Sequence, residues 1–417
     1  MSDTVNENKS EYARIDEQQS IISPTTIARG TPEYRRAGLA FFLLGFASFS
    51  LIYCVQPLLP AFTHAFSVTP AQSSLALSLT TGLLALSILL AGAFSQAVGR
   101  RGLMFSSMAL ASICNFIAAV VPDWHMLLIA RAAEGVVLGG VPAVAMAWLA
   151  EEIDKRHLGK TMGLYVGGTA FGAMMGRVGM GLLTEFTSWR MAMAVLGVLC
   201  LIAAVGFILL LPESKNFQRK PGLNLHFHLK TWSQHLKNPA LLRLYATGFF
   251  LTSIFVTLFN YATFRLSAEP FSFSQTQVSL IFCAFAFGIV SSSVAGGLAD
   301  RFGKKPLLIT GFILMLAGVL CTIPTSLASI IIGIILVTTG FFVAHSVASG
   351  SVGPLAGSTR GHASSLYLLF YYMGSSITGS VGGWFWLHGG WNAIVWLTVA
   401  ISAAGLFLAL FAKQNNN

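Results

Sequence analysis

The feature that most constrains this chain is a series of twelve apolar runs, each about as long as a membrane-spanning helix. The hydrocarbon core of a bilayer is about 30 Å thick, which a helix of about 20 residues crosses. Lipid offers no hydrogen-bond partners to the backbone, so each run is expected to be helical. We predict an all-α membrane protein with twelve transmembrane helices at 37–59, 73–95, 103–121, 126–149, 162–184, 191–211, 241–264, 277–299, 306–323, 327–349, 363–386 and 392–412.

Composition supports lipid as the solvent for most of the chain. The 417 residues are 55% hydrophobic and 10% charged, whereas soluble domains carry about 25% charged residues. The five cysteines all fall within apolar runs and lack the spacing of metal ligands. We therefore expect no metal and no other cofactor.

The basic residues predict the orientation of the chain. With the N-terminus in the cytoplasm, all but four of the 25 Lys and Arg residues lie on or beside cytoplasmic segments. The exceptions are Arg190 and Arg265 outside, and Arg131 and Arg177 within helices. The positive-inside rule therefore predicts a multi-pass protein with both termini in the cytoplasm. The same asymmetry explains the net charge of +10 without nucleic acid as a partner.

Polar segments divide the chain into domains. Residues 1–36 mix acids and bases and lack the apolar stretch of a signal peptide, which predicts a disordered cytoplasmic tail. The basic loop 212–240 separates a six-helix bundle at 37–211 from a second bundle at 241–412, and 413–417 form a cytoplasmic tail. Apolar residues within the loop indicate a segment lying on the membrane surface.

An internal repeat relates the two bundles. The loop after the second helix of the first bundle reads GAFSQAVGRR from Gly92, and its counterpart in the second bundle reads GGLADRFGKK from Gly296. The glycines recur at a constant offset of 204 residues, from Gly92 to Gly296 and from Gly99 to Gly303. Such copies are typical of parallel repeats about an axis normal to the membrane. We therefore predict two pseudo-symmetric six-helix bundles.

These motifs resemble the major facilitator superfamily, over residues 37–412. The second loop matches that family's G-x-L-A-D-R-x-G-R/K-K loop, and the stretch from Arg131 to Gly135 resembles its R-x-x-Q-G signature. The resemblance is to the bacterial drug and metabolite efflux branch, including arabinose-efflux-like permeases, and implies a bacterial inner membrane location. It also implies that the loops gate the cytoplasmic side through Gly92, Gln96, Gly99, Arg100, Arg101, Gly296, Asp300, Arg301, Gly303 and Lys304.

Two departures from the family pattern matter for function. Gln96 replaces the acid of the first loop, so that latch is weaker or works through Arg100 and Arg101 against Glu151 and Glu152. Gly168, Gly172 and Gly176 resemble an antiporter motif and form a ridge that lets another helix approach closely. The family usually has proline next, where this chain has Arg177.

Charges at membrane depth are functional candidates, because they are costly there. Glu134 is the one carboxylate that we place inside a predicted helix, and it shares a helix face with Arg131. Burial favours its protonated form, whereas a neighbouring arginine favours its anion. We predict Glu134 as the proton-coupling group, with Arg131 and Arg177 as its charge partners. A fixed ion pair between helices is the alternative, and Arg177 has a second alternative role as anchor for an anionic substrate.

Aromatic and polar residues near the midplane are candidates for substrate binding. They are Tyr53, Gln56, Asn260, Tyr261, Tyr367 and Tyr371. His345 is expected to form an interhelical hydrogen bond rather than to titrate.

The leading hypothesis is a secondary active transporter that exports a small organic solute by alternating access and proton antiport. Uptake by proton symport or facilitated diffusion is the alternative, and a membrane sensor without transport is a third hypothesis. No nucleophile and base pair indicates an enzyme. The expected partners are the bilayer and a small-molecule substrate, with the monomer as the functional unit and protons as the coupling ion.

Overall fold

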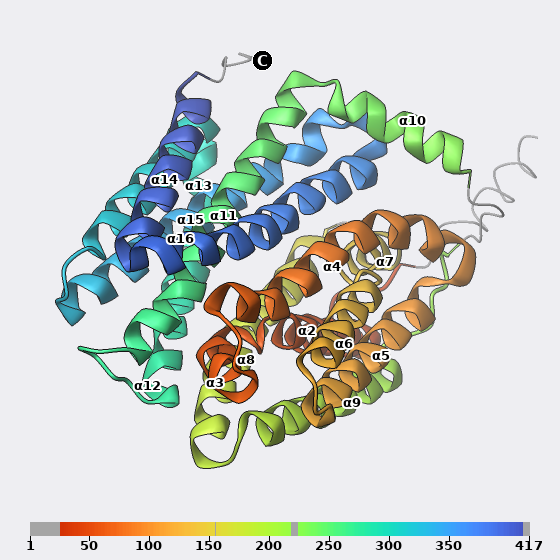
Figure 1. Ribbon diagram of the computed structural model, residues 1–417. Coiled ribbons are helices and arrows are strands. Elements are labelled where there is room, and N and C mark those ends of the chain that lie inside the picture. Colours follow the sequence, from red (N-terminus) through yellow and green to blue (C-terminus); the bar gives the residue numbers. More distant parts are fainter. Residues whose placement is uncertain (1–25, 155, 218–223, 412–417) are drawn as a thin grey trace, which may run out of the picture.

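A computed structural model describes residues 26–154, 156–217 and 224–411. Within these ranges the regular structure is helical, apart from one isolated bridge between Ile27 and Ile153. Figure 1 shows two helical bundles, one from the first half of the chain (red to yellow-green) and one from the second half (green to blue). The prediction of an all-α membrane protein with twelve spans in two pseudo-symmetric bundles is confirmed.

The first bundle contains six spans, two of which are interrupted. Its elements are α2 (Pro32–Tyr53), η1 (Gln56–Leu58), α3 (Leu59–Phe66), α4 (Pro70–Val98), α5 (Arg100–Val120), α6 (Trp124–Leu138), α7 (Pro142–Glu152), α8 (Leu158–Phe186) and α9 (Trp189–Leu210).

The second bundle follows the surface helix α10 (Leu225–Leu236). Its elements are α11 (Pro239–Ser267), α12 (Gln275–Ser279), η2 (Leu280–Ala284), α13 (Phe285–Phe302), α14 (Lys304–Cys321), α15 (Leu327–Leu355), η3 (Gly357–Thr359) and α16 (Arg360–Leu410). The last of these comprises two spans that meet at Gly390, whose φ of 55° is non-helical.

Local sequence explains where the spans begin and break. Thr31 caps α2 by accepting a hydrogen bond from the Tyr34 amide at 3.2 Å, and Pro32 occupies the first turn. The helix ends at Tyr53 because Pro57 lacks an amide hydrogen and its ring crowds the carbonyl four residues earlier. The first span is therefore a broken helix.

The predicted N-terminal tail is shorter than 1–36 in the structure. Residues 32–36 form the first turn of α2. Ile27 bridges to Ile153, with its amide donating to the Glu152 carbonyl and its carbonyl accepting from the Asp154 amide. Residues 1–25 lie outside the described part, as do the C-terminal tail 413–417, Lys155 and residues 218–223 of the central loop.

Helix α10 corresponds to the membrane-surface segment expected in the central loop, and Figure 1 shows it outside both bundles. Leu225, Phe227 and Leu229 are exposed on it. His228 contacts His362 at the start of α16, with 2.8 Å between Nδ1 and Nε2. This contact attaches the helix to the second bundle.

The two bundles meet near one face of the molecule. We call the face with the α4–α5 and α13–α14 loops the basic face, and the face with α3 and α12 the opposite face. Near the opposite face, Ser376 Oγ donates to the Ser78 carbonyl at 2.7 Å. Gly181 of α8 packs so tightly on Ser279 that a Cβ there would lie 2.2 Å from the serine side chain. These contacts close the space between the bundles.

Toward the basic face the same helices have space beside them. An added Cβ at Gly163 or Gly167 of α8 would meet nothing within 4 Å. The same holds for Gly296 and Gly297 of α13. These four positions therefore have no neighbouring helix packed directly against them.

Candidate functional site

Arg131 of α6 donates hydrogen bonds to the end of α2, where the first span breaks. Its guanidinium donates to the carbonyls of Leu51 and Ile52, at 3.1 and 2.8 Å, and to the carbonyl of Ala76 on α4 at 3.1 Å. Carbonyls in the last turn of a helix lack partners within the helix. Arg131 supplies such partners from a neighbouring span and is completely buried.

Glu134 completes this cluster with one oxygen and leaves the other unpaired. Its Oε2 accepts from Arg131 Nη1 at 2.7 Å, and both side chains are 0% exposed. Among the described residues, its Oε1 has no hydrogen-bond partner. An unpaired buried carboxylate oxygen is costly, and protonation of that oxygen would lower the charge of the group. The pair predicted from i, i+3 spacing is thus formed, and Glu134 Oε1 is the oxygen that could accept a proton.

Arg177 does not pair with Glu134, contrary to the predicted partnership. Its Nε donates to Gln56 Oε1 at 2.6 Å and its Nη1 to the Ala173 carbonyl at 2.5 Å. The described residues contain no ion pair with Arg177, although its side chain is 1% exposed. Closely packed glycines on α8 fix how this helix faces α2, which turns Arg177 toward the residues after the break.

Three aromatic rings surround the Arg177 guanidinium. Its carbon lies 4.1 Å from the ring centre of Tyr53, 5.1 Å from Phe282 and 4.7 Å from Phe285. Each such contact is worth about 0.5–2 kcal/mol, whereas removing an ion from water costs on the order of several kcal/mol. The rings therefore offset part of the burial of this cation.

Gln56 joins Arg177 to the second bundle. Its Nε2 donates to Oδ1 of Asn260 on α11 at 2.6 Å, and the two residues lie 204 positions apart. This is the offset of the glycine loops, so the repeat relates these two residues to each other. A chain of polar contacts therefore runs from Arg177 through Gln56 to Asn260, between the bundles.

The predicted substrate residues separate into two groups. Tyr53, Gln56 and Asn260 lie in or beside the polar chain, and the ring of Tyr371 lies 4.8 Å from that of His345. Tyr261 and Tyr367 do not join them. The Tyr261 hydroxyl donates to the Gly379 carbonyl at 2.7 Å, and the Tyr367 hydroxyl lies 2.9 Å from His345 Nδ1. His345 thus makes the interhelical hydrogen bond expected for it.

Phe282 and Phe285 are site residues that the sequence analysis missed. They come from η2 and the start of α13, three residues apart, and so face the same neighbour. Further rings continue the wall, with Phe341 stacked on His345 at 5.5 Å and His345 4.8 Å from Tyr371. Apolar residues inside an apolar run give no sequence signal that separates them from packing residues.

The gating loops differ between the bundles. Gly99 and Gly303 have φ of 103° and 87°, which favours glycine. Arg100 binds Glu151 through two hydrogen bonds of 2.6 and 2.5 Å, which is one of the two expectations for the first loop. Arg101 instead donates to the Ile208 carbonyl at 2.6 Å.

The second loop exposes three of its charged residues. Asp300, Arg301 and Lys304 are exposed, and no ion pair of Asp300 occurs among the described residues. Gly296 has open space beside it. The surroundings of Gly92 and Gln96 lie outside the described part. The latch role of Asp300 stays a prediction.

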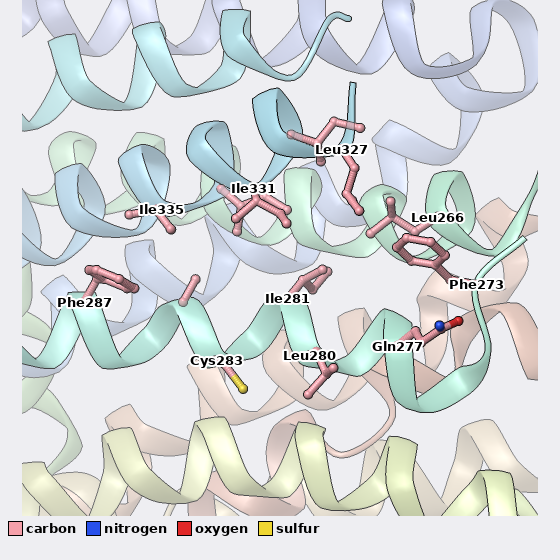
Figure 2. A pocket seen from close by; sticks show the side chains of 13 residues that line it. Leu266, Phe273, Gln277, Leu280, Ile281, Cys283, Phe287, Leu327, Ile331 and Ile335 are labelled. Carbon is pink, nitrogen blue, oxygen red and sulfur yellow. The ribbon is translucent and has the colours of Figure 1, made fainter. Parts of the chain in front are cut away.

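A pocket of about 370 Å³ lies in the second bundle between α11, α12–α13 and α15 (Figure 2). Apart from Gln277 its lining is apolar, and Leu280, Phe287 and Ile331 are exposed on it. It holds no charged group and does not include Arg177 or Glu134. An apolar pocket with exposed leucine and isoleucine suits contact with lipid better than the recognition of a polar solute.

The fold and the comparisons with known proteins define a multi-pass membrane transporter. Residues 41–269 and 264–416 match the family model for the Major Facilitator Superfamily. The uncharacterized MFS-type transporter YybF of Bacillus subtilis (strain 168) is 43% identical over 391 residues, 94% of this chain and 96% of the relative. The inner membrane transport protein YnfM of Escherichia coli (strain K12) is 43% identical over 383 residues, 91% of each chain.

Solved structures agree on the fold. The structure of a mutant of the nucleoside transporter NupG superposes with a TM-score of 0.73 at 14% identity, over 90% of this chain and 99% of that one. The chain belongs to the Major Facilitator Superfamily.

Proposed function

We propose that this chain is a proton-coupled secondary transporter that exports a small organic solute across the bacterial inner membrane by alternating access. The observation that carries the proposal is the buried Arg131–Glu134 pair at the break in the first span. Glu134 has one oxygen on Arg131 and one oxygen free to take a proton. Protonation at Oε1 neutralises the carboxylate and weakens its attraction for Arg131.

The proposed coupling step depends on the hydrogen-bond partners of Arg131. The same guanidinium binds Glu134 and the carbonyls that end α2. When Glu134 becomes neutral, Arg131 is free to shift toward its carbonyl partners, and α2 shifts with it. The residues after the break contact the second bundle through Gln56. A proton on Glu134 thereby biases how the bundles meet.

Alternating access is supported by where hydrogen bonds join the bundles and where space is left beside their helices. Hydrogen bonds join the bundles near the opposite face, whereas Gly163, Gly167, Gly296 and Gly297 have open space toward the basic face. We assign the basic face to the cytoplasm by the positive-inside rule. This conformation then faces inward, and both termini are cytoplasmic. The name of the relative YnfM supports the inner membrane, and we propose that the monomer is sufficient.

A flux assay in proteoliposomes tests the proposal. The purified protein is reconstituted, and a panel of small metabolites is screened under an imposed pH gradient. We expect solute to move against the proton flow, and Glu134→Gln to lose gradient-driven flux while solute exchange at equal pH persists. Glu33→Gln removes an exposed carboxylate at the start of α2 and serves as the control.

Each alternative has its own outcome in this assay. Movement of solute with the proton flow would identify a symporter. Flux that ignores the gradient would exclude proton coupling, and a Glu134→Gln protein with parental gradient-driven flux would exclude Glu134 as the coupling group.

A further inference from the structure

Arg177 and Arg131 are both buried arginines, but their partners differ. Arg131 has a carboxylate and three carbonyl oxygens as acceptors. Arg177 has two neutral acceptors, Gln56 Oε1 and the Ala173 carbonyl, and its Nη2 has no hydrogen-bond partner among the described residues. Arg177 thus keeps a full positive charge that no described group neutralises.

The packing of the repeat does not require this charge. Gly172 of α8 lies against Phe46, where an added Cβ would be 2.2 Å from the carbonyl, and Gly374 of α16 lies against Phe249 in the same way at 2.3 Å. Carried along both helices, this correspondence places Gly379 where the first bundle has Arg177. Gly379 lies beside Asn260, the counterpart of Gln56, and has no side chain to bring a charge there. The arginine is therefore an addition to a fold that closes without it.

The groups around Arg177 favour a particular kind of counter-ion. Three aromatic rings have their centres within 5.1 Å of the guanidinium carbon, and the N–H donors of a guanidinium all lie in its plane. A planar fork of N–H donors matches a carboxylate, which it binds through two parallel hydrogen bonds. Rings continue from Phe285 through Phe341 and His345 to Tyr371, which offers an apolar surface beside the charge.

We propose that the transported solute is a small organic anion, a carboxylate with an apolar or aromatic body, whose carboxylate pairs with Arg177. This inference rests on the proposed transport function and names its substrate class. The carboxylate takes the free edge of the guanidinium and competes with Gln56 for Nε. Because Gln56 also binds Asn260, entry of the anion loosens the contact that closes the opposite face.

Ligand-induced stabilisation of the purified protein tests the inference without a proton gradient. The probes are matched in shape and differ in charge: benzoate, benzamide and benzylamine, with cyclohexanecarboxylate, acetate and sodium chloride as further members. We expect benzoate and cyclohexanecarboxylate to raise the unfolding temperature in a saturable way. Benzamide, benzylamine and chloride should bind at least tenfold more weakly.

Variants locate the binding at Arg177. Arg177→Gln should weaken benzoate binding at least tenfold, and Arg177→Lys should keep the preference for anions at reduced affinity. Lys160→Gln removes an exposed charge from the same helix and should bind as the parent does. If Arg177→Gln does not fold, two measurements still test whether an anion binds at Arg177. They are the comparison of charged and neutral probes in the parent protein, and the affinity of the Arg177→Lys variant.

Four outcomes would overturn the inference: equal binding of benzamide or benzylamine, stabilisation by chloride alone, undiminished benzoate binding in Arg177→Gln, or no binding in the whole series. None of these outcomes bears on proton coupling, which the flux assay with Glu134→Gln tests separately.

Discussion

Gln56 and Asn260 are counterparts in the internal repeat, and they bind each other directly, with 2.6 Å between Nε2 and Oδ1. Residues related by a two-fold axis meet only where they lie close to that axis. The hydrogen bond therefore marks the pseudo-symmetry axis of the molecule. It also joins the bundles at the level where the first span breaks.

Removal of the Gln56–Asn260 bond should favour opening toward the opposite face. A buried hydrogen bond contributes about 0.5–1.5 kcal/mol net, so we expect Asn260→Ala to raise the open population about twofold to tenfold. The measurement is the labelling rate of a cysteine at Ser279 by an impermeant maleimide, in a protein without its native cysteines. Ser279 is buried against Gly181 in the closed contact.

The double variant of Gln56 and Asn260 is the internal check for this prediction. It should label no faster than the single variants if the two side chains act through one bond. Thr398→Ala removes a buried hydrogen bond within α16 and should leave labelling unchanged. Additive effects of the two substitutions would contradict the prediction.

The close contact between α2 and α8 predicts opposite effects for two glycines on one helix. A Cβ at Gly172 would lie 2.2 Å from the Phe46 carbonyl, whereas one at Gly167 would meet nothing within 4 Å. Gly172→Ala should therefore destabilise the protein by about 1–3 kcal/mol through overpacking. Gly167→Ala should be neutral or stabilising by up to about 1 kcal/mol from helix propensity. Thermal unfolding in detergent measures both, and equal effects would contradict the packing.

Substitutions of Arg131 and Glu134 should differ in their effect on stability. Arg131→Lys keeps the charge but cannot serve four acceptors in one plane, so buried oxygens lose their donors at about 1–3 kcal/mol each. Glu134→Gln keeps a side chain of the same size, and its free energy of unfolding should lie within about 1 kcal/mol of the parent's. The reason is that the amide oxygen of glutamine can still accept from Arg131, while its nitrogen can donate to an oxygen. Thermal unfolding measures both. A strongly destabilised Glu134→Gln protein would indicate a structural ion pair instead.

Glu185 predicts a pH-dependent contact at the opposite face. This residue lies just beyond the predicted span 162–184 and accepts from Ser274 Oγ and the Thr276 amide of the second bundle, both at 2.8 Å. These hydrogen bonds hold the pKa of Glu185 below its ordinary value of 4.5. A group with a lowered folded pKa stabilises the contact above that ordinary value, and its contribution is lost as the pH falls through the folded pKa.

The thiolate is the reacting form of cysteine, so labelling is compared with that of free cysteine at the same pH. Relative to that reference, labelling at the Ser279 cysteine should rise as external pH falls below 4.5. Glu185→Gln should label faster at neutral pH and lose this dependence. Because Glu185 is exposed, we expect a change smaller than that of Asn260→Ala. A pH response that persists in Glu185→Gln would assign it to another group.

Sequence alone predicted the spans, because their length and apolarity are properties of single segments. It also predicted the Arg131–Glu134 pair, since residues three apart on one helix must lie close together. It did not predict that Arg177 turns toward Gln56 and away from Glu134, which depends on the rotation of α8 against α2. Nor did it separate Tyr261 and Tyr367 from the site, because a tyrosine in an apolar run has the same pattern whether it packs or binds.

The capping of α2 by Arg131 has a consequence for biogenesis. Leu51 and Ile52 precede Arg131 by 80 and 79 residues. At about 5–20 residues per second, the ribosome needs roughly 4–16 s to synthesise that distance. During this interval the first segment has entered the translocon without the donors for its terminal carbonyls. Its final conformation must wait for α6, so the first four spans mature in the membrane as one unit.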